Sequence, residues 1–301
     1  MTIEIPKYDK PEEGVKASGL SKEDRQIKMN RIVIEHDRLT KAVDAIRMNH
    51  RPVIGGIPNS GKFFALIGDS RSGKSFAVDR YVKQNPRIQV GGNTKIPVLK
   101  INTPIDGTVH SVSNAILAEA GIHVNPRLNA TALMDTVIRI LPLVGCELLI
   151  LDEFNEVANS TRVRAMESMR SFLRRLVDQA GVVAMLVGLE KTYDILAADT
   201  QIAGRNLPVH IIPSYDMRSA RDQEDFLVVC EAIDAFLPFR EWSGLSDERV
   251  ALRLAEASGG LIGRLKNLIC MAGWRALNDD APRIEILHLA EAYGTLIAEE
   301  K

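Results

Sequence analysis

The sequence has few cysteines and no long apolar run. Its three cysteines, Cys146, Cys230 and Cys270, show neither CxxC spacing nor nearby histidines, which argues against a zinc site and favours buried, reduced thiols. No stretch approaches the run of about 18 apolar residues that a membrane-spanning helix requires. Residues 1–16 are charged and lack the apolar core of a signal peptide. These absences predict a cytoplasmic protein with no membrane partner.

An excess of either charge is also missing. Lys and Arg number 38 and Asp and Glu number 39, which gives a formal net charge of -1. No overall positive field therefore draws the chain onto nucleic acid, and any contact with DNA has to come from a local basic patch. A weak patch repeated along a filament of many copies meets that condition.

With 301 residues, 46% of them hydrophobic and 26% charged, the chain has the composition of a folded globular protein near the upper size limit of a single core. Residues 1–20 combine charges, prolines and glycines without periodicity, which predicts an extended arm. Ser21 can cap a helix with Asp24 in the reciprocal position, and apolar residues then recur until Pro52. We therefore expect a helix over residues 21–50.

Apolar strands alternate with helices through the middle of the chain. The predicted strands cover residues 63–67, 96–101, 148–151 and 182–187. Helices are predicted over residues 76–83, 112–120, 132–141 and 160–180. This alternation indicates βαβ units and an α/β fold, with a parallel sheet that helices cover on both faces.

Strands are not predicted in the C-terminal part of the sequence. Amphipathic helices are expected there over residues 222–236, 247–257, 262–277 and 284–298. The predicted organisation is therefore an arm over residues 1–20, an α/β domain over 21–218 and a small all-helical domain over 219–301.

A phosphate-binding motif follows the first predicted strand. The pattern GxxxxGK[ST] is matched in full by Gly68-Asp69-Ser70-Arg71-Ser72-Gly73-Lys74-Ser75. In this P-loop the backbone amides surround the phosphates, Lys74 reaches the β- and γ-phosphates, and the Ser75 hydroxyl binds Mg²⁺. Phe76 opens the helix that follows and completes the predicted nucleotide-binding set. The cofactors that we expect are ATP and Mg²⁺.

A second motif ends the strand over residues 148–151, where Asp152 and Glu153 follow four apolar residues. A strand that ends in acids is common, but downstream of a P-loop this one has the form of a Walker B strand. Asp152 is then expected to hold the magnesium, generally through water, and Glu153 to orient and polarise the attacking water. An Asp-Glu pair favours ATP hydrolysis over simple nucleotide sensing.

These motifs, in this order, resemble the AAA+ regulators of DNA transposition of the TniB and TnsC type. The resemblance runs from Ser21 to the last helix. Its more specific features are the segment Gln-Ile-Ala-Gly-Arg-Asn at residues 201–206, the Leu-Pro-Phe that ends residues 222–239, and the Gly-Gly-Leu-Ile-Gly turn at residues 259–263. It implies an AAA+ P-loop domain followed by a helical lid domain.

The resemblance also implies a function. Such regulators assemble with themselves into rings or helical filaments on double-stranded DNA, without sequence preference, and link target-site selection to a partner transposase. ATP binding stabilises the assembly and hydrolysis dismantles it.

Three alternatives remain: a signalling or switch ATPase that controls protein partners without DNA, a helicase-loader or replication-initiator AAA+ protein, and a metabolic kinase. We expect the first to carry long repeat domains, the second an appended DNA reader, and the third an acceptor pocket.

Further roles follow from the resemblance alone. Arg205 corresponds to an arginine that reaches the γ-phosphate on a neighbouring subunit, and Arg264 to a sensor 2 residue that contacts nucleotide in cis. The alternative for Arg205 is a solvated or ion-paired loop residue, and for Arg264 an ordinary surface arginine. The chain departs from the family where relatives carry a small polar sensor 1 residue, because Leu189 stands there. Glu190 or Thr192 substitutes for it, or hydrolysis is slow.

Candidate DNA contacts come from two regions. On the helix over residues 160–180, Arg164 and Arg175 share one face at helical spacing. Such a stripe is equally typical of a solvated helix face. The rival contacts, in the region where relatives touch the DNA backbone, are Lys95, Lys100 and Thr108. Contacts of either kind would bind phosphate without reading bases.

Overall fold

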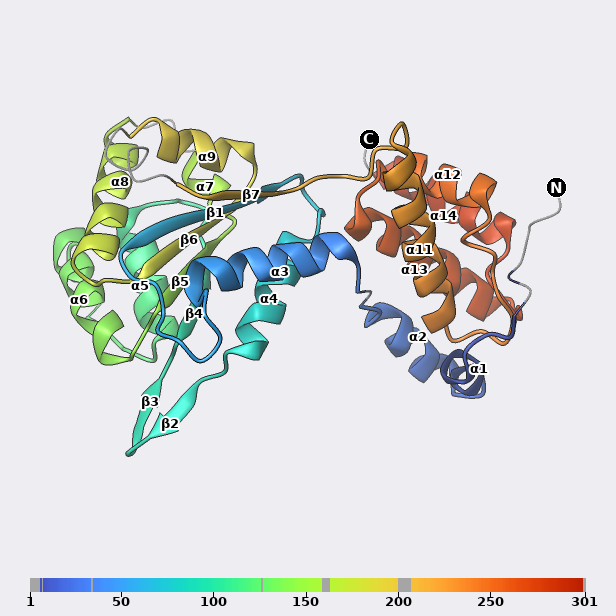
Figure 1. Cartoon of the computed structure of the whole chain (residues 1–301), viewed down its shortest axis with the longest axis horizontal. Coiled ribbons are helices and arrows are strands. Elements are labelled where there is room, and N and C mark those ends of the chain that lie inside the picture. Colours follow the sequence, from blue (N-terminus) through green and yellow to red (C-terminus); the bar gives the residue numbers. More distant parts are fainter. Residues whose placement is uncertain are drawn as a thin grey trace. The chain divides into compact units, whose positions relative to one another are not determined.

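The computed structural model describes residues 6, 8–33, 35–125, 127–158, 163–199 and 207–299. The chain forms two compact units. The helical unit combines Met1–Asp37 with Ser214–Lys301, and the sheet unit is Arg38–Pro213. Figure 1 shows the sheet in the second unit and helices in the first. The division falls after residues 37 and 213, whereas the boundaries predicted from the sequence fall after residues 20 and 218.

The described residues of the sheet unit form a five-stranded parallel sheet of order β4-β5-β6-β1-β7. The strands are β1 (Lys62–Gly68), β4 (Val98–Asn102), β5 (Leu148–Asp152), β6 (Val183–Gly188) and β7 (Val209–Ile212). Strands β5 and β6 are buried throughout, as predicted from their continuous apolar sequences. Strand β7 was not predicted, because it is a short edge strand with exposed positions.

Helices cover both faces of this sheet, which confirms the predicted α/β class. Helices α3 (Asp37–His50) and α4 (Lys74–Gln84) pack on one face, where Phe64 and Leu66 of β1 lie. The other face, with Phe63, Ala65 and Ile67, packs against α5 (Val109–Glu119), α6 (Ala130–Leu143) and α8 (Val163–Asp178). The sheet unit also contains the short helices α7 (Asn155–Ala158) and α9 (Glu190–Ala197).

An antiparallel hairpin extends from the sheet unit (Figure 1). Its strands are β2 (Ile88–Val90) and β3 (Asn93–Lys95), and all six of their residues are exposed. Gly91 and Gly92 join them with φ values of +57° and +81°, which glycine adopts without strain and which match the twist of a two-residue hairpin. The predicted strand over residues 96–101 corresponds to β4, which begins two residues later, and the hairpin before it was not predicted.

The helical unit contains α1 (Glu12–Ser18), α2 (Lys22–Asn30), α11 (Ala220–Phe236), α12 (Glu248–Ser258), α13 (Ile262–Asn278) and α14 (Ile286–Glu299). The last four agree with the predicted helices within a few residues. Ser21 caps α2, as predicted, by accepting a hydrogen bond from the Asp24 backbone N–H. The predicted helix over residues 21–50 is instead two helices, α2 and α3. The β-branched run at residues 32–34 between them disfavours helix.

The segment before α2 is part of the helical unit and differs from the extended arm that the sequence predicts. The Lys10 ammonium lies 3.6 Å from an Asp234 carboxylate oxygen, and both side chains are almost completely buried. Lys10 also donates a hydrogen bond to the Glu241 carbonyl at 3.1 Å. Gly14 packs so tightly that a Cβ there would lie 2.6 Å from the Ala235 carbonyl oxygen. Because a buried charge needs a partner, this ion pair fixes the N-terminal segment to α11.

Two predictions about the rest of the chain can be checked against the fold. In the described part, no helix combines the length and the apolar character that crossing a membrane requires. Cys146, Cys230 and Cys270 are buried free thiols, as predicted. Burial raises the pKa of the Cys146 thiol to about 12, so it stays protonated at neutral pH.

We expect Lys10→Met to lower the free energy of unfolding by about 3–5 kcal/mol, because it leaves the Asp234 carboxylate buried without its counter-charge. Urea unfolding followed by circular dichroism measures the change. Lys16→Met is the control, since the Lys16 side chain is 77% exposed and pairs with Glu12 at the surface, where ion pairs contribute little. Equal unfolding midpoints for the two variants would contradict the assignment of a buried pair.

Candidate functional site

The P-loop lies where β1 ends. Gly68 is the last residue of β1 and Lys74 the first of α4, so the loop connects a buried strand to a helix N-terminus, the arrangement that binds phosphate. Gly73 has a φ of +102°, which favours glycine. A Cβ on Gly68 would lie 2.7 Å from both the Ile212 carbonyl oxygen and the Ser72 hydroxyl. Only glycine fits at that position.

Lys74 is turned into the loop. Its side chain is buried, and its ammonium donates hydrogen bonds to the carbonyl oxygens of Gly68 at 2.8 Å and Asp69 at 2.7 Å. Burial lowers the pKa of Lys74, against the opposing charges of Glu153, Asp152 and Asp69. The ammonium therefore sits among acceptors that phosphate oxygens can replace.

Other members of the predicted set also lie in or next to the loop. The Ser72 hydroxyl is buried, and no described residue bonds to it, which leaves it for a ligand oxygen. Asp69, Ser70 and Arg71 are exposed on the loop, and Phe76 is 39% exposed in the first turn of α4. The loop residues are therefore in the positions that the motif requires.

The two acids of the second motif end β5. Leu148 and Ile150 pack with α4, and the alternation of a strand places Asp152 on that same face of the sheet. Asp152 is 2% exposed. Glu153 is exposed and has a φ of +54°, a conformation that residues other than glycine seldom adopt and that is concentrated at functional sites. Its backbone N–H donates a hydrogen bond to an Asp152 carboxylate oxygen at 3.0 Å.

A cavity of 440 Å³ brings together the two predicted metal ligands, Ser75 and Asp152, and the predicted catalytic residue Glu153. Its lining residues are Ser75, Asp79, Lys100, Asn102, Thr103, Ile105, Asp152, Glu153 and Glu156. The lining has four carboxylates and one lysine, so its charge favours a cation. Oxygen donors of this kind suit Mg²⁺, which is usually held by one or two carboxylates together with substrate phosphates. In the described part of the chain, no group of three His, Cys, Asp or Glu side chains is placed to hold a metal ion by itself.

Lys100, one of the candidate DNA contacts predicted from the sequence, lines this cavity. Its ammonium is 3.2 Å from an Asp152 carboxylate oxygen and 2.6 Å from one of Asp79. The reason is the strand period: Val98 of β4 faces α4, and Lys100, two residues on, points to the same side. Burial would lower the pKa of Lys100, but the bonds to Asp79 and Asp152 raise it, so the ammonium keeps its charge.

Two more of the predicted DNA contacts have partners within the chain. Thr108 is the N-cap of α5 and accepts a hydrogen bond from the Ser111 backbone N–H at 3.1 Å. Arg175 pairs with Asp135 at 2.6 Å. The side chain of Arg164 lies outside the described part of the structure. Lys95 is exposed at the end of the β2–β3 hairpin.

Three buried polar side chains lie near the ends of the strands, and only one of them, Thr192, was named from the sequence. Asn155 Oδ1, Thr192 Oγ1 and Thr103 Oγ1 are buried, and no described residue bonds to any of them. A Cβ on Gly188, the last residue of β6, would collide with Thr192 and lie 3.0 Å from Asn155 Oδ1. Of the two sensor 1 substitutes, Thr192 is thus fully buried beside the end of β6, while Glu190 is exposed.

A usable signal exists for two of these residues. Asn155 and Thr103 each follow a strand end within three residues, at the edge of a parallel sheet where ligands bind. The described structure tests the role of neither predicted arginine. Arg205 lies outside the described residues, and Arg264 is exposed in the first turn of α13, in the helical unit. Their roles stay predictions.

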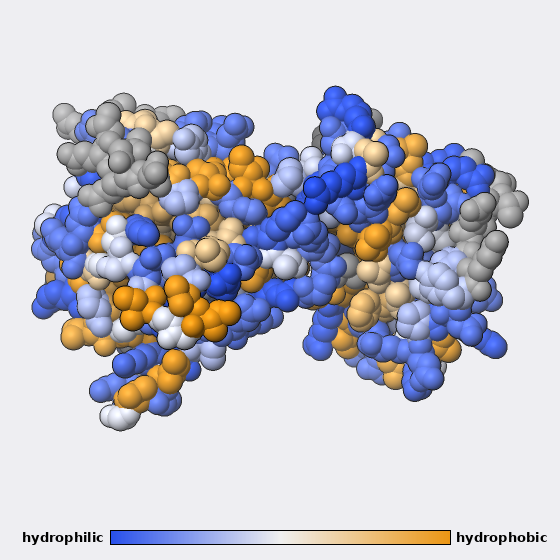
Figure 2. Space-filling model, in the orientation of Figure 1, coloured by the Kyte–Doolittle hydropathy of each residue, from blue (hydrophilic) through white to orange (hydrophobic). Residues whose placement is uncertain are grey.

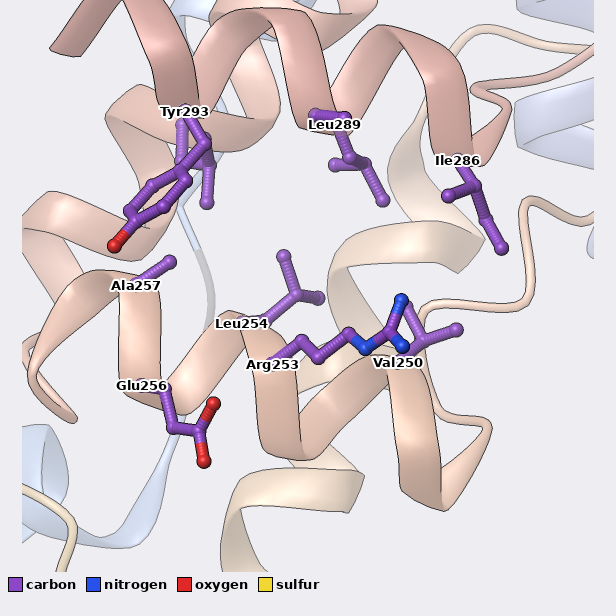
Figure 3. A pocket seen from close by; sticks show the side chains of 10 residues that line it. Val250, Arg253, Leu254, Glu256, Ala257, Ile286, Leu289 and Tyr293 are labelled. Atoms are coloured by element: carbon purple, nitrogen blue, oxygen red, sulfur yellow. The ribbon is translucent and has the colours of Figure 1, made fainter. Parts of the chain in front are cut away.

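The helical unit has a pocket of its own, of 260 Å³, between α12, α13 and α14. Figure 3 shows Leu254, Ile286, Leu289 and Tyr293 around it, with Arg253 and Glu256 as charged neighbours. Its lining is mainly aliphatic. It therefore lacks the convergent polar groups that would hold a triphosphate.

Thr192→Val tests the sensor assignment. We expect the free energy of unfolding to stay the same or to rise, because the variant removes a buried hydroxyl that has no partner in the described structure. ATP turnover should fall about 10–100-fold if that hydroxyl bonds to a charged group of the substrate. Steady-state phosphate release and urea unfolding measure the two quantities. Unchanged turnover would remove Thr192 as a sensor, and Glu190→Gln is the matched comparison.

Comparison with known proteins gives a family and a fold. The family described as bacterial TniB protein matches residues 22–215. No curated protein sequence matches the chain. Among solved structures, the ORC2 protein of Aeropyrum pernix, as ADPNP-ADP complexes, is 16% identical with a TM-score of 0.61, over 90% of this chain and 71% of that one.

Two further structures give the same result. The Aeropyrum pernix ORC1 protein in complex with DNA is 17% identical with a TM-score of 0.59, over 90% of this chain and 69% of that one. Drosophila ORC bound to DNA is 16% identical with a TM-score of 0.59, over 99% and 69%. At these identities the likeness shows the fold alone, which is the predicted AAA+ fold.

Proposed function

The chain belongs to the bacterial TniB protein family, and on this premise we propose that it is an ATP-dependent AAA+ regulator of DNA transposition. In this proposal it assembles with itself on double-stranded DNA and links target-site selection to a transposase. The observation that carries the proposal is the single cavity in which Ser75, Asp152 and Glu153 meet beside the P-loop. That cavity has the groups for binding and hydrolysing a nucleoside triphosphate with magnesium.

Each of these groups has a distinct task in hydrolysis. Lys74 exchanges the carbonyl oxygens of Gly68 and Asp69 for phosphate oxygens. Ser75 and Asp152 hold the magnesium ion, which, when bound, neutralises phosphate charge and orients the transferred group. Glu153 accepts a hydrogen bond from the attacking water and polarises it. Asp152 keeps the Glu153 backbone fixed through the 3.0 Å bond to its N–H.

Assembly would couple this chemistry to the neighbouring copies. Arg205 of one copy is proposed to reach the γ-phosphate held by the next, and Arg264 to contact nucleotide in its own copy. Apolar surface supports self-association. Figure 2 shows such surface over the loop between α3 and β1, where Val53, Ile54 and Ile57 are 65%, 92% and 85% exposed.

DNA contact is proposed for the β2–β3 hairpin. Lys95 is exposed there, and residues 80–105 contain no Asp or Glu that would repel phosphate. Two proteins of similar fold, Aeropyrum pernix ORC1 and Drosophila ORC, were solved with DNA, which supports such a contact. Binding through lysine and phosphate carries no sequence preference. The same likeness favours one alternative, a replication-initiator or helicase-loader type of AAA+ protein.

Sedimentation with ATP, Mg²⁺ and double-stranded DNA of arbitrary sequence tests the proposal. We expect large species only when ATP and DNA are both present. Lys74→Ala should abolish nucleotide binding and assembly together, because the phosphates lose their main cation. Glu153→Gln should bind ATP but hydrolyse it at least about 100-fold more slowly, and so stay assembled.

Either of two results would contradict this proposal. A protein that binds ATP yet stays small and ignores DNA would act as a nucleotide switch for protein partners. A Glu153→Gln variant that hydrolyses ATP at the wild-type rate would remove Glu153 from the reaction.

Lys95→Gln tests the DNA contact. We expect weaker binding to all sequences alike and a salt dependence that is smaller by about one counterion, since one phosphate contact is lost. Fluorescence anisotropy at several salt concentrations measures both. Arg175→Gln is the matched control and should leave DNA affinity unchanged, because Arg175 pairs with Asp135. The opposite pattern would move the DNA surface from the hairpin to α8.

A further inference from the structure

Lys100 is held between two carboxylates in the nucleotide cavity. Asp152, at the end of β5, is the predicted magnesium ligand, and Asp79 lies on α4 one helical turn after Ser75. The ammonium is 3.2 Å from Asp152 and 2.6 Å from Asp79. The Lys100 side chain is 20% exposed and that of Asp152 only 3%. The Lys100 ammonium therefore lies beside the Asp152 carboxylate, the group that is proposed to bind the metal ion.

Two cations near one carboxylate oppose each other. Unit charges of like sign about 4 Å apart repel by about 1 kcal/mol in water and by more in a partly buried site. Magnesium can therefore bind beside Asp152 only if Lys100 moves away or stays at a cost. Asp79 gives the ammonium somewhere to go, because its side chain is 51% exposed and already bonded to Lys100.

We infer that Lys100 is a resident cation of the magnesium site, which holds Asp152 before magnesium binds and then withdraws to Asp79. In this role Lys100 is a positioning residue that sets the Mg²⁺ concentration at which nucleotide binds. The inference rests on the proposed function, since it presumes that the cavity binds ATP with magnesium.

The surroundings of Lys100 support this role over a contact with DNA. Its ammonium points into the cavity that Ser75, Asp152 and Glu153 line. The ammonium is bonded to both Asp79 and Asp152. The same two bonds also position Asp152 without any metal. Lys100 thereby links the binding and release of magnesium to the position of the Asp152 carboxylate.

The test is a magnesium titration of nucleotide binding by the full chain, with a fluorescent ATP analogue as the probe. We expect Lys100→Met to lower the Mg²⁺ midpoint at least about fivefold, because a competing charge is gone. With EDTA present, the same variant should bind the analogue more weakly than wild type, since its cavity has lost a cation. Lys100→Arg keeps the charge and should stay near the wild-type midpoint.

Asp79→Asn distinguishes the withdrawal of Lys100 to Asp79 from a direct effect of the Asp79 charge on magnesium binding. The variant should raise the Mg²⁺ midpoint, because Lys100 then has only Asp152 to bond. In a Lys100→Met background the same change should have much less effect, and this non-additivity is measured as a double-mutant cycle. If Asp79→Asn shifts the midpoint equally in both backgrounds, the inference fails, because the carboxylate then acts by its charge alone.

The controls distinguish the two proposals. Lys83→Met, at an exposed position in the last turn of α4, should titrate as wild type does. Failure of the wild-type protein to bind the analogue at any Mg²⁺ concentration would overturn the proposed function. Wild-type binding together with an unchanged midpoint in Lys100→Met would overturn only the role of Lys100. Urea unfolding of each variant checks folding, and Lys100→Gln replaces Lys100→Met if the latter does not fold.

Discussion

The nucleotide site depends on the parallel register of four strands. Because β1, β4, β5 and β6 run in the same direction, their carboxyl ends meet at one edge of the sheet. Ile67 pairs with Gly188, and Asn102 with Asp152, so residues far apart in sequence come level there. The P-loop after β1 and the acids after β5 therefore need no further scaffold to face each other. A shift of one residue in β5 would turn Asp152 away from α4.

Electrostatics explains the composition of this edge. Four carboxylates line the cavity, and a site that is to receive a polyphosphate would be expected to avoid such a surplus. Cations would resolve the conflict: Lys74 within the loop, Lys100 between two acids, and, in the proposed function, magnesium with the substrate. Under that proposal the nucleotide and the metal bind together, since neither charge would be well accommodated alone.

Sequence predicted those parts of the structure that depend on contiguous residues. The P-loop, the strand before Asp152 and the four C-terminal helices each have a complete local pattern. The place of Lys100 in the cavity was not predicted, because its partners come from β5 and α4, which only the folded sheet brings near. Thr108 was read as a DNA contact, although its side chain caps α5. The segment before α2 looked unstructured because its order comes from Asp234, more than 200 residues later.

That long-range pairing has a consequence for biosynthesis. The helical unit is discontinuous, with the sheet unit inserted between its first two helices and the rest. On the ribosome, Lys10 emerges long before Asp234, and at about 5–20 residues per second the delay is on the order of ten seconds or more. During that time the sheet unit can complete its core, whereas α1 and α2 have nothing to pack against. Residues of α1 and α2 are thus made before the helices they pack against, and they are among the last parts of the helical unit to fold.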